Sequence, residues 1–435
     1  MERRTSYIDN IDISIMPFID FSDYPDRYPV LSVEIFDLEF YDELRYISRR
    51  LFKIFDKITK LLQYNDKDIL LDLGIPEKSI PYMSIPNKLN LSTWLSRFDY
   101  VLDKNRNLKL VELNADTPCA FVEAYYGNGI ACDYFGLENP NKFEYNKLIE
   151  FLGEVADRVI RKFVDLDRKE FVNREPFLFT CFDDYKEDLG TTRFLMEAMK
   201  KSKQVKEYNL SVIFESLYKL WVDDLGIILS DGTRPQAVYR MHPLEMLLEE
   251  KAIDGSDLGL LFLDRYKEGR FSMMNPPESI IIQDKLFLSL VWNLSESDNK
   301  VLTYSDKELI KSVMIPAYVD FDDVENKDNS YWIKKPVYGR EGLGIEIIDN
   351  KGNIIEESGS HLGVPVNDNN VYLYQKYIDQ PIYKEDTDSG LKEGYLTLSC
   401  FMLGDYPSAV YGRFSEDKIC STDAYWLPLG IRIIS

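Results

Sequence analysis

The sequence has only two histidines, His242 and His361, among 435 residues. Zinc sites built on histidine and Ser-His-Asp triads need histidines at defined positions beside their other residues. Two isolated histidines are too few for these kinds of site. A divalent metal in this protein is therefore expected to bind oxygen ligands, and His242 is expected to be structural or to lie at the rim of a substrate site.

Paired cysteines are also lacking. The five cysteines are scattered without a CxxC pair, at positions Cys119, Cys132, Cys181, Cys400 and Cys420. An odd, unpaired set of this kind is typical of a reducing compartment rather than of a disulfide framework. We expect all five to be reduced.

Long apolar runs are absent too, since stretches such as LGLLFL at 258–263 are far too short to span a bilayer. The opening MERRTSYIDNIDISIMPF has no apolar core of the kind that a signal peptide carries. We therefore expect a cytoplasmic protein without a membrane partner.

Positive charge is scarce relative to negative charge, with 52 basic and 74 acidic residues giving a net charge of −22. Such a field repels phosphate backbones, so nucleic acid is not expected as a partner. Small anions are not excluded, because a few lysines and arginines in one cleft reverse the local potential. The same field attracts a cationic amine.

The composition is that of a folded protein, with 45% hydrophobic and 29% charged residues. A chain of this length is expected to form two or more domains. No repeat or Gly/Ser linker marks a boundary between them.

The local patterns alternate between helix and strand and predict an α/β (α+β) fold. An amphipathic helix is expected over 42–64, and a buried strand at 177–182 is followed by a helix that Thr191 or Thr192 would cap. Strands are expected on either side of Asp231-Gly232, with a helix after Pro243. From residue 331 onward, strands predominate, with turns at 350–352 and 404–405.

A hairpin is predicted over 97–116, where two alternating runs flank the polar turn 104–107. With the turn centred between residues 105 and 106, Asp99 faces Glu112 and Arg97 faces Asn114, all on one face. Like charges directly opposite one another are unfavourable unless something bridges them. Two carboxylates, an amide oxygen and an arginine form a reasonable Mg²⁺ site with a cation beside it. An exposed polar hairpin face is the alternative, and a one-residue bulge would change the register.

A glycine-rich loop follows the strand that carries Lys334 and Lys335, in YWIKKPVYGREGLGIEIID at 331–349. A Walker loop or a dinucleotide-binding loop opens a helix, and GxxxxGK[ST] is absent. Here a second strand follows the glycines, which favours a lid whose backbone amides close over phosphates while a strand lysine contacts them. We expect this loop to be mobile without nucleotide. An ordinary glycine-containing hairpin is the alternative.

Successive blocks of the chain resemble one family. These blocks are WLSRFDY, VELNADTP, YRMHPLEM, PPESIIIQDKLFLSLVW, IKKPVYGREGLGIEI, LYQKYI and YGRFSEDKICSTDAYWLPLGI, in that order from about residue 94 to the C-terminus. They resemble the glutathionylspermidine synthase-like ATP-grasp ligases, and the resemblance covers the synthetase part only, without an amidase domain. It implies an ATP-grasp fold, with a pre-ATP-grasp and substrate-binding region over 1–272 and the nucleotide-binding lobes over 273–435.

The resemblance also implies roles for individual residues. It makes Asp99, Glu112 and Asn114 ligands of Mg²⁺ or Mn²⁺, with Arg97 as the transition-state arginine and Arg413 as a second catalytic arginine. Lys285 and Lys335 would contact ATP, and the segment Gln375, Lys376, Tyr377 and Ile378 would read the adenine edge. The lid would consist of Gly339, Arg340, Glu341, Gly342 and Gly344.

The chain departs from the family at two positions near the C-terminus. Phe414 stands where a carboxylate is usual, and Cys420 stands where a threonine is usual. Both changes would remove polar groups near the acceptor, so we expect a substrate pair other than glutathione and spermidine.

The expected activity is an ATP-dependent carboxylate–amine ligase that forms an amide through an acyl phosphate, with ADP and phosphate as the other products. Its partners would be ATP, a small carboxylate and an amine. One alternative is cysteine catalysis by Cys119, disfavoured because no histidine lies nearby in the sequence. The other is a degenerate ATP-grasp protein that binds nucleotide or a peptide without turnover.

Overall fold

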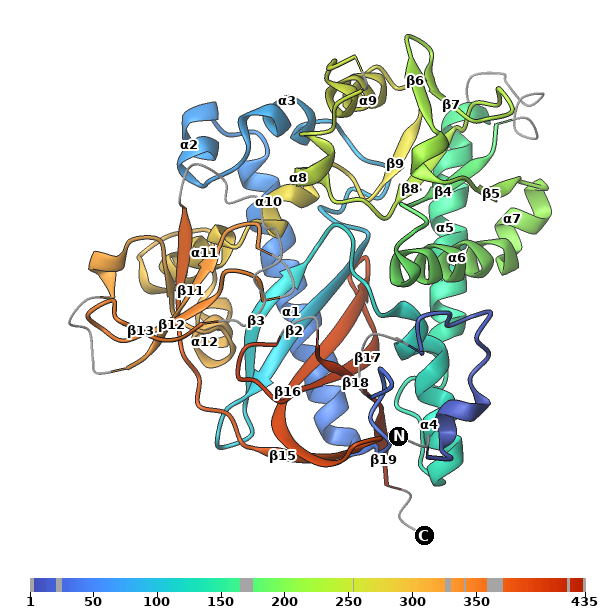
Figure 1. Ribbon diagram of the computed structural model, residues 1–435. Coiled ribbons are helices and arrows are strands. Elements are labelled where there is room, and N and C mark those ends of the chain that lie inside the picture. The colour runs from blue at the N-terminus through green and yellow to red at the C-terminus, as the bar shows by residue number, and fades with distance from the viewer. Residues whose placement is uncertain are drawn as a thin grey trace.

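A computed structural model describes residues 4–20, 26–164, 175–252, 254–324, 330–339, 342–357, 371–420 and 423–432. Three larger sheets, two two-stranded pairs and the helices around them make up the described part of the fold (Figure 1). The predicted mixture of helices and strands is confirmed.

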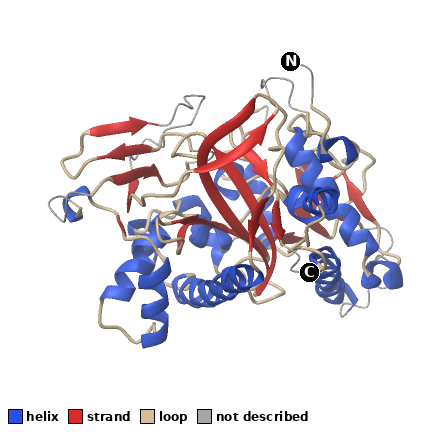
Figure 2. Cartoon of the chain, turned by 90° about the horizontal axis from the view of Figure 1, so that it is seen from below, coloured by secondary structure: helices blue, strands red, loops and turns tan. Residues whose placement is uncertain are grey.

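The central sheet is antiparallel and joins two distant parts of the chain. Its order is β18 (Tyr425–Leu427), β17 (Tyr406–Ser415), β16 (Gly390–Leu403), β2 (Leu95–Leu102) and β3 (Leu108–Asn114), with β15 (Tyr383–Thr387) paired to β16. A parallel pair of β1 (Glu34–Phe36) and β19 (Leu429–Ile431) connects the same two parts. Seen from below, the long strands of this sheet lie between helices (Figure 2).

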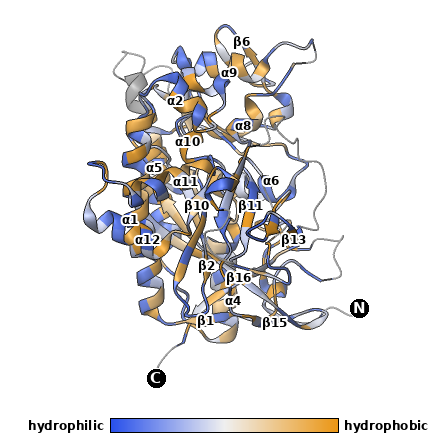
Figure 3. Cartoon of the chain, turned by 90° about the vertical axis from the view of Figure 1, so that its left-hand side faces the viewer, coloured by the Kyte–Doolittle hydropathy of each residue, from blue (hydrophilic) through white to orange (hydrophobic). Residues whose placement is uncertain are grey.

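Helix α1 (Leu38–Leu62) contacts β16 and β17 and is the amphipathic helix that the sequence predicts. Asp37 caps its N-terminus by accepting a hydrogen bond from the Phe40 N–H. Its buried face includes Leu44, Leu51 and Phe55, and Figure 3 shows hydrophobic and hydrophilic residues side by side along it. Burial of this apolar face anchors the helix on the sheet.

A second antiparallel sheet lies to the left of the central sheet in Figure 1. Its order is β10 (Ala317–Tyr318), β14 (Tyr372–Lys376), β11 (Trp332–Pro336), β12 (Glu346–Ile348) and β13 (Ile354–Glu357). Helices α11 (Leu286–Glu296) and α12 (Tyr304–Val313) pack against each other, and α11 contacts β10 and β14.

The third sheet is parallel and lies near α5 (Glu144–Val164), α6 (Lys186–Lys201) and α7 (Lys203–Tyr208). Its order is β5 (Val212–Phe214), β4 (Phe177–Thr180), β8 (Ala237–Arg240) and β9 (Ser272–Met274). A small hairpin of β6 (Trp221–Asp223) and β7 (Gly226–Ile228) follows β5. The remaining helices are short: α2 (Lys67–Asp72), α3 (Ile80–Met83), α4 (Asn128–Phe135), α8 (Leu244–Leu247), α9 (Leu258–Lys267) and α10 (Ser279–Gln283).

Most predicted elements are confirmed, including the strand at 177–180, the short helix after Pro243 and the strands after residue 331. The predicted cap at Thr191 or Thr192 is wrong. Helix α6 begins at Lys186, and both threonines are buried inside it. Glu187 and Asp188 occupy its first turn, where acidic side chains interact favourably with the helix dipole. The DDYKEDLG segment, between the strand and the two threonines, therefore supplies the start of the helix.

The β2–β3 hairpin has the predicted pairs at its open end. Arg97 pairs with Asn114, and Asp99 pairs with Glu112. The turn is one residue shorter than predicted, since Asp103 and Asn107 close a three-residue loop in which Arg106 has φ +65°. A register shift between Asp99 and Tyr100 compensates for this difference. The two deviations cancel, so the four polar residues keep their predicted positions.

No helix in the described ranges is both long and apolar enough to cross a membrane.

Candidate active site

A cavity of about 1000 Å³ is lined by strands of the central sheet and of the second sheet, and by residues that follow β4 and β8 of the third sheet. Its wall takes residues from β2, β3, β11, β14 and β17 and from the start of α6. Further lining residues come from β16 and from segments near residues 26–28, 117–123, 241–250, 282–285 and 416–425. Most of the site residues predicted from the sequence face this one space.

The strand ends that carry the site are fixed by a buried amide and a buried ion pair. Asn275 Oδ1 accepts hydrogen bonds from the N–H groups of Trp94 (2.9 Å) and Leu95 (2.8 Å), while its Nδ2 donates to the Asp116 carbonyl (2.7 Å). Asp116 forms two hydrogen bonds with the Arg240 guanidinium at 2.8 and 2.9 Å. Because every partner is buried, these contacts hold the start of β2 beside the end of β3.

Arg97 and Asp99 form a buried pair on β2. Nε of Arg97 donates to Oδ1 at 2.7 Å, and Nη2 donates to Oδ2 at 2.8 Å. Burial raises the pKa of Asp99, but the charge and hydrogen bonds of Arg97, together with the charge of Arg413, outweigh it and hold that pKa below its usual value. Asp99 is therefore an ionised carboxylate at neutral pH.

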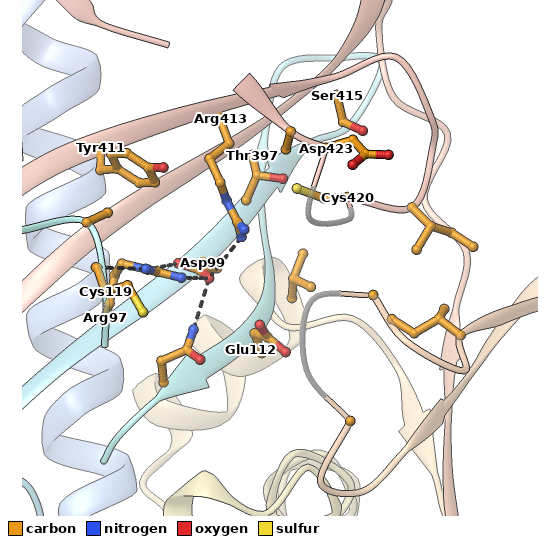
Figure 4. A pocket seen from close by; sticks show the side chains of 18 of the residues that line it. Arg97, Asp99, Glu112, Cys119, Thr397, Tyr411, Arg413, Ser415, Cys420 and Asp423 are labelled. Carbon is orange, nitrogen blue, oxygen red and sulfur yellow. Dashed lines mark hydrogen bonds and ion pairs between the residues drawn. The ribbon is translucent and has the colours of Figure 1, made fainter. Parts of the chain in front are cut away.

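Two further groups approach the same carboxylate, as Figure 4 shows. Nδ2 of Asn114 donates to Oδ2 of Asp99 at 3.0 Å, which leaves the Asn114 side-chain oxygen as the acceptor end of that amide. Nη2 of Arg413, from β17, lies 3.6 Å from the same Oδ2 atom. Asp99 is thus shared between two arginines and one amide.

Glu112, Lys285 and Lys335 form a second charged group. Nζ of Lys285 lies 3.7 Å from Oε2 of Glu112 and donates to the Gly339 carbonyl at 2.6 Å. Lys335 is 3% exposed and donates to Oε1 of Gln375 at 2.7 Å. Burial lowers the pKa of Lys335 to about 8, with Glu112 opposing this shift and Lys285 adding to it. Two lysines and one carboxylate therefore meet between the second sheet and β3.

The oxygen donors on the β2–β3 hairpin are of the kind that bind a magnesium ion. Among the described residues, no three histidine, cysteine, aspartate or glutamate side chains converge to hold a metal. Mg²⁺ commonly takes one or two carboxylates, with phosphate oxygens and water completing its shell. Asp99, Glu112 and the amide oxygen of Asn114 provide this kind of incomplete oxygen set, and all three line the cavity.

The glycine loop is described only in part, since Arg340 and Glu341 lie outside the described residues. Gly339 and Gly342 line the cavity. Gly342 has φ +74°, and a Cβ added there would lie 2.7 Å from the Cys420 carbonyl oxygen. Only glycine fits this contact, because both the backbone conformation and the space exclude a side chain. Gly344, with φ +68°, packs on Pro336 and does not line the cavity.

The segment Gln375–Ile378 also lines the cavity. The N–H groups of Lys376 and Tyr377 donate to the carbonyls of Pro316 and Tyr331, each at 2.9 Å. These bonds fix the backbone of the segment where β14 ends. The side chain of Gln375 is buried against Lys335.

The two departures from the family behave differently. Cys420 lines the cavity, as expected. Phe414 does not: it is fully buried in the core and its ring packs near Tyr425. The expectation that Phe414 lies near an acceptor is therefore wrong. Since side chains alternate along a strand, Arg413 and Ser415 face the cavity and the residue between them faces the core.

His242 and Cys119 both line the cavity. Nε2 of His242 lies 3.1 Å from Oε1 of Glu250, and its ring packs edge-on against Phe182. The Cys119 carbonyl accepts a hydrogen bond from Nη1 of Arg97 at 2.9 Å. His242 thus has the buried, partnered surroundings of a structural or rim residue.

Tyr28, Glu123 and Tyr411 are among the cavity residues that sequence reasoning missed. Tyr28 Oη lies 3.0 Å both from Oε1 of Glu123 and from Oη of Tyr411. The Arg97 guanidinium lies 5.8 Å from the centre of the Tyr411 ring. Strand alternation places Tyr411 on the same face as Arg413, so this residue was open to prediction. No spacing pattern links Tyr28 to Glu123.

The sequence matches the family described as glutathionylspermidine synthase preATP-grasp over residues 21–432. A relative from Haemophilus influenzae (strain ATCC 51907 / DSM 11121 / KW20 / Rd), provisionally named acid–amine ligase, is 23% identical over 335 residues, which cover 76% of this chain and 73% of the relative. A solved structure of a glutathione synthetase-like effector from Globodera pallida, in its apo form, superposes with a TM-score of 0.53 and 10% identity, covering 93% of this chain and 90% of the other. The fold is accordingly of the ATP-grasp α/β type.

Proposed function

On the premise that the chain belongs to the glutathionylspermidine synthase preATP-grasp family, we propose that it is an ATP-dependent ligase that joins a carboxylic acid to an amine. One observation carries this proposal. Two arginines, two lysines, two carboxylates and an amide from four separate parts of the chain face a single cavity. The relative named acid–amine ligase supports the same reaction class.

The reaction would proceed in two steps. The substrate carboxylate takes the γ-phosphoryl group of ATP to give an acyl phosphate and ADP. The amine then attacks the acyl carbon and releases phosphate. No protein nucleophile is needed, so the work of the chain is to position the reactants and to neutralise charge.

Each charged group has a place in this scheme. Lys285 and Lys335 would contact the phosphates of ATP, and the segment Gln375–Ile378 would hold the adenine. Arg97 and Arg413 would stabilise the transferring phosphoryl group and the oxyanion that develops on the acyl carbon. Removal of one such donor typically costs about 3 kcal/mol of barrier, roughly a hundredfold in rate.

Asp99, Glu112 and Asn114 would hold Mg²⁺ or Mn²⁺, which when bound neutralises phosphate charge during the transfer. Ionised Asp99 also keeps Arg97 in place through two hydrogen bonds. We further propose the division into a pre-ATP-grasp region over 1–272 and nucleotide-binding lobes over 273–435, although the central sheet takes strands from both.

The amine is proposed to be cationic, since a net charge of −22 attracts it over a distance. The substrate pair is proposed to differ from glutathione and spermidine. Because Phe414 is buried in the core, the proposal of a different substrate pair depends on Cys420 alone. At this position a thiol replaces the threonine hydroxyl that is usual in the family, beside the glycine loop.

The test is a pairwise screen of amino acids, short peptides and polyamines for ADP release, with the mass of each product confirmed. Turnover that needs both an acid and an amine, and that is lost in Glu112→Gln, supports the proposal. ADP release that depends on no acid–amine pair, or nucleotide binding without turnover, contradicts it. Abundant glutathionylspermidine from glutathione and spermidine would keep the ligase assignment and refute the changed substrate pair.

A further inference from the structure

A buried carboxylic acid in the cavity has no role in the scheme above. Glu123 is 3% exposed and lines the same cavity as the two arginines. It begins a π-helical turn over Glu123–Gly127 that leads into α4. Such turns are rare and occur often at functional sites, because they displace side chains from ordinary helical positions.

The two oxygens of Glu123 have different surroundings. Oε1 accepts a hydrogen bond from the Tyr28 hydroxyl at 3.0 Å. Oε2 is buried and has no hydrogen-bond partner among the described residues. A buried polar atom without a partner is unfavourable, and a ligand that donates a hydrogen bond there would remove the cost. Oε2 is therefore a buried acceptor atom, on a residue of the cavity wall, for which the described residues provide no donor side chain.

Four residues from three other parts of the chain influence the protonation of Glu123 or of its hydrogen-bond partner. Burial raises the pKa of Glu123 to about 7, while a hydrogen bond from its own backbone N–H, the Tyr28 hydroxyl and the positive charges of Arg97 and Arg413 oppose the rise. Tyr411 stands between the tyrosine and the arginines, with its hydroxyl 3.0 Å from that of Tyr28. A carboxyl group balanced in this way takes up and releases a proton near neutral pH, which is what a general base requires.

The same contacts connect Glu123 to Arg97. Tyr411 bonds to Tyr28 on one side, and its ring lies 5.8 Å from the Arg97 guanidinium on the other. Figure 4 shows Tyr411 beside the Arg97–Asp99 pair. Glu123 is thus connected through two tyrosines to the arginine that the proposed function places at the acyl group.

We propose that Glu123 accepts the proton of the attacking amine, a role that rests on the proposed ligase function. The ammonium group gives one proton to Oε2 of Glu123 and becomes a neutral amine. The nitrogen lone pair forms the C–N bond to the acyl carbon, and the C–O bond to the phosphate breaks. The second N–H proton leaves with the phosphate as hydrogen phosphate. Glu123 returns its proton to solvent before the next turnover.

The test compares two nucleophiles in the Glu123→Gln variant. Hydroxylamine is largely unprotonated at neutral pH and attacks an acyl phosphate without a base, giving a hydroxamate that is measured with iron(III). The second nucleophile is the amine that gives product in the pairwise screen, used with the same acid. We expect amide formation to fall at least about a hundredfold in the variant, the usual contribution of a general base, and hydroxamate formation to stay near the wild-type rate.

Further variants separate a proton acceptor from a structural residue. Glu197→Gln makes the same chemical change at an exposed carboxylate of α6 that does not line the cavity, and it is expected to lower neither product. Glu123→Asp is expected to recover part of the amide rate. In the wild type, amide formation should rise with pH through about 7, the pKa of Glu123, and this rise should be absent from the Gln variant.

The outcomes of these measurements distinguish the role of Glu123 from the proposed ligase function. Loss of amide with retained hydroxamate supports the proposal and also shows that the variant folds. Retained amide, or equal loss of both products, overturns the role of Glu123 while leaving the ligase function in place. Absence of hydroxamate from the wild-type enzyme with every acid tested means that no acyl phosphate forms, which overturns the proposed function and this inference with it.

Discussion

Arg97 holds both carboxylate oxygens of Asp99, through Nε at 2.7 Å and Nη2 at 2.8 Å, and both side chains are almost completely buried. Breaking such a pair by removing one charge leaves the other charge uncompensated. Glu112 faces Asp99 across the hairpin but is partly exposed, with 29% of its side chain accessible. The two carboxylates therefore make different contributions to stability.

The first prediction compares Asp99→Asn with Glu112→Gln. Both should abolish metal-dependent ADP release, because each removes a charge from the proposed metal ligands. Only Asp99→Asn should also destabilise the fold, by about 3–5 kcal/mol, since it leaves Arg97 unpaired. Denaturant unfolding and turnover with varied Mg²⁺ measure the two effects. Normal Mg²⁺-dependent turnover in either variant would remove that residue from the metal site.

The second prediction concerns Lys335. Its folded pKa of about 8 lies below the ordinary value of 10.5, so between these values the unfolded state binds more protons and stability rises with pH. Below pH 8 Lys335 is charged in both the folded and the unfolded state. Burial of this charge then lowers the free energy of unfolding by an amount that does not change with pH. Lys335→Met should remove the rise, which reaches at most about 1.4 kcal/mol per pH unit.

The same residue predicts how nucleotide affinity depends on pH. ATP should bind more weakly above pH 8 as Lys335 loses its charge, and by at most about tenfold per pH unit for one proton. Titration calorimetry of wild type and Lys335→Met over this range checks both statements. Identical pH dependence in the two proteins would show that Lys335 is not the titrating group.

The third prediction concerns the glycine loop. Gly342→Ala should lower ATP turnover at least about tenfold, because a Cβ would lie 2.7 Å from the Cys420 carbonyl at φ +74°. Gly352→Ala is a matched control: it has φ +83° but does not line the cavity. It should lose stability and keep turnover. Equal turnover in both variants would show that the position of Gly342 is unimportant for catalysis.

The fourth prediction separates Phe414 from Cys420. Phe414→Glu, which restores the residue type usual in the family, should unfold or severely destabilise the protein, because it buries an unpaired charge in the core. Cys420→Thr should leave the fold intact and change the KM of a substrate, because this residue lines the cavity. A folded Phe414→Glu protein with altered substrate preference would contradict the assignment of Phe414 to the core.

The sequence predicts the β2–β3 pairing well because alternation along two strands allows few registers. It does not specify the compensation between the shorter turn at Arg106 and the shift beside Tyr100, which depends on packing. Phe414 was misplaced although the same alternation applies to β17. The residue type usual at a family position does not reveal which face of the strand that position occupies, and here Phe414 lies on the core face.

Contacts between distant segments are the part that local patterns do not reveal. The convergence of Arg413 on Asp99, the hydrogen bond from Tyr28 to Glu123 and the support of β2 by Asn275 each join residues far apart in the chain. Periodicity identifies a strand and its faces, but it does not identify its neighbours when these lie elsewhere in the sequence. The start of α6 was missed for a different reason, since threonines suit both caps and helix interiors.

The pairing of β2 with β16 also affects how the protein folds during its synthesis. Asp99 lies opposite Ser399, so one edge of β2 stays open during synthesis until most of the chain has left the ribosome. An unpaired strand edge is a template for pairing with other chains. Sheets built from distant segments also fold slowly. Newly made protein should therefore aggregate more readily than refolded full-length protein, and chaperones that shield open strands should raise its yield.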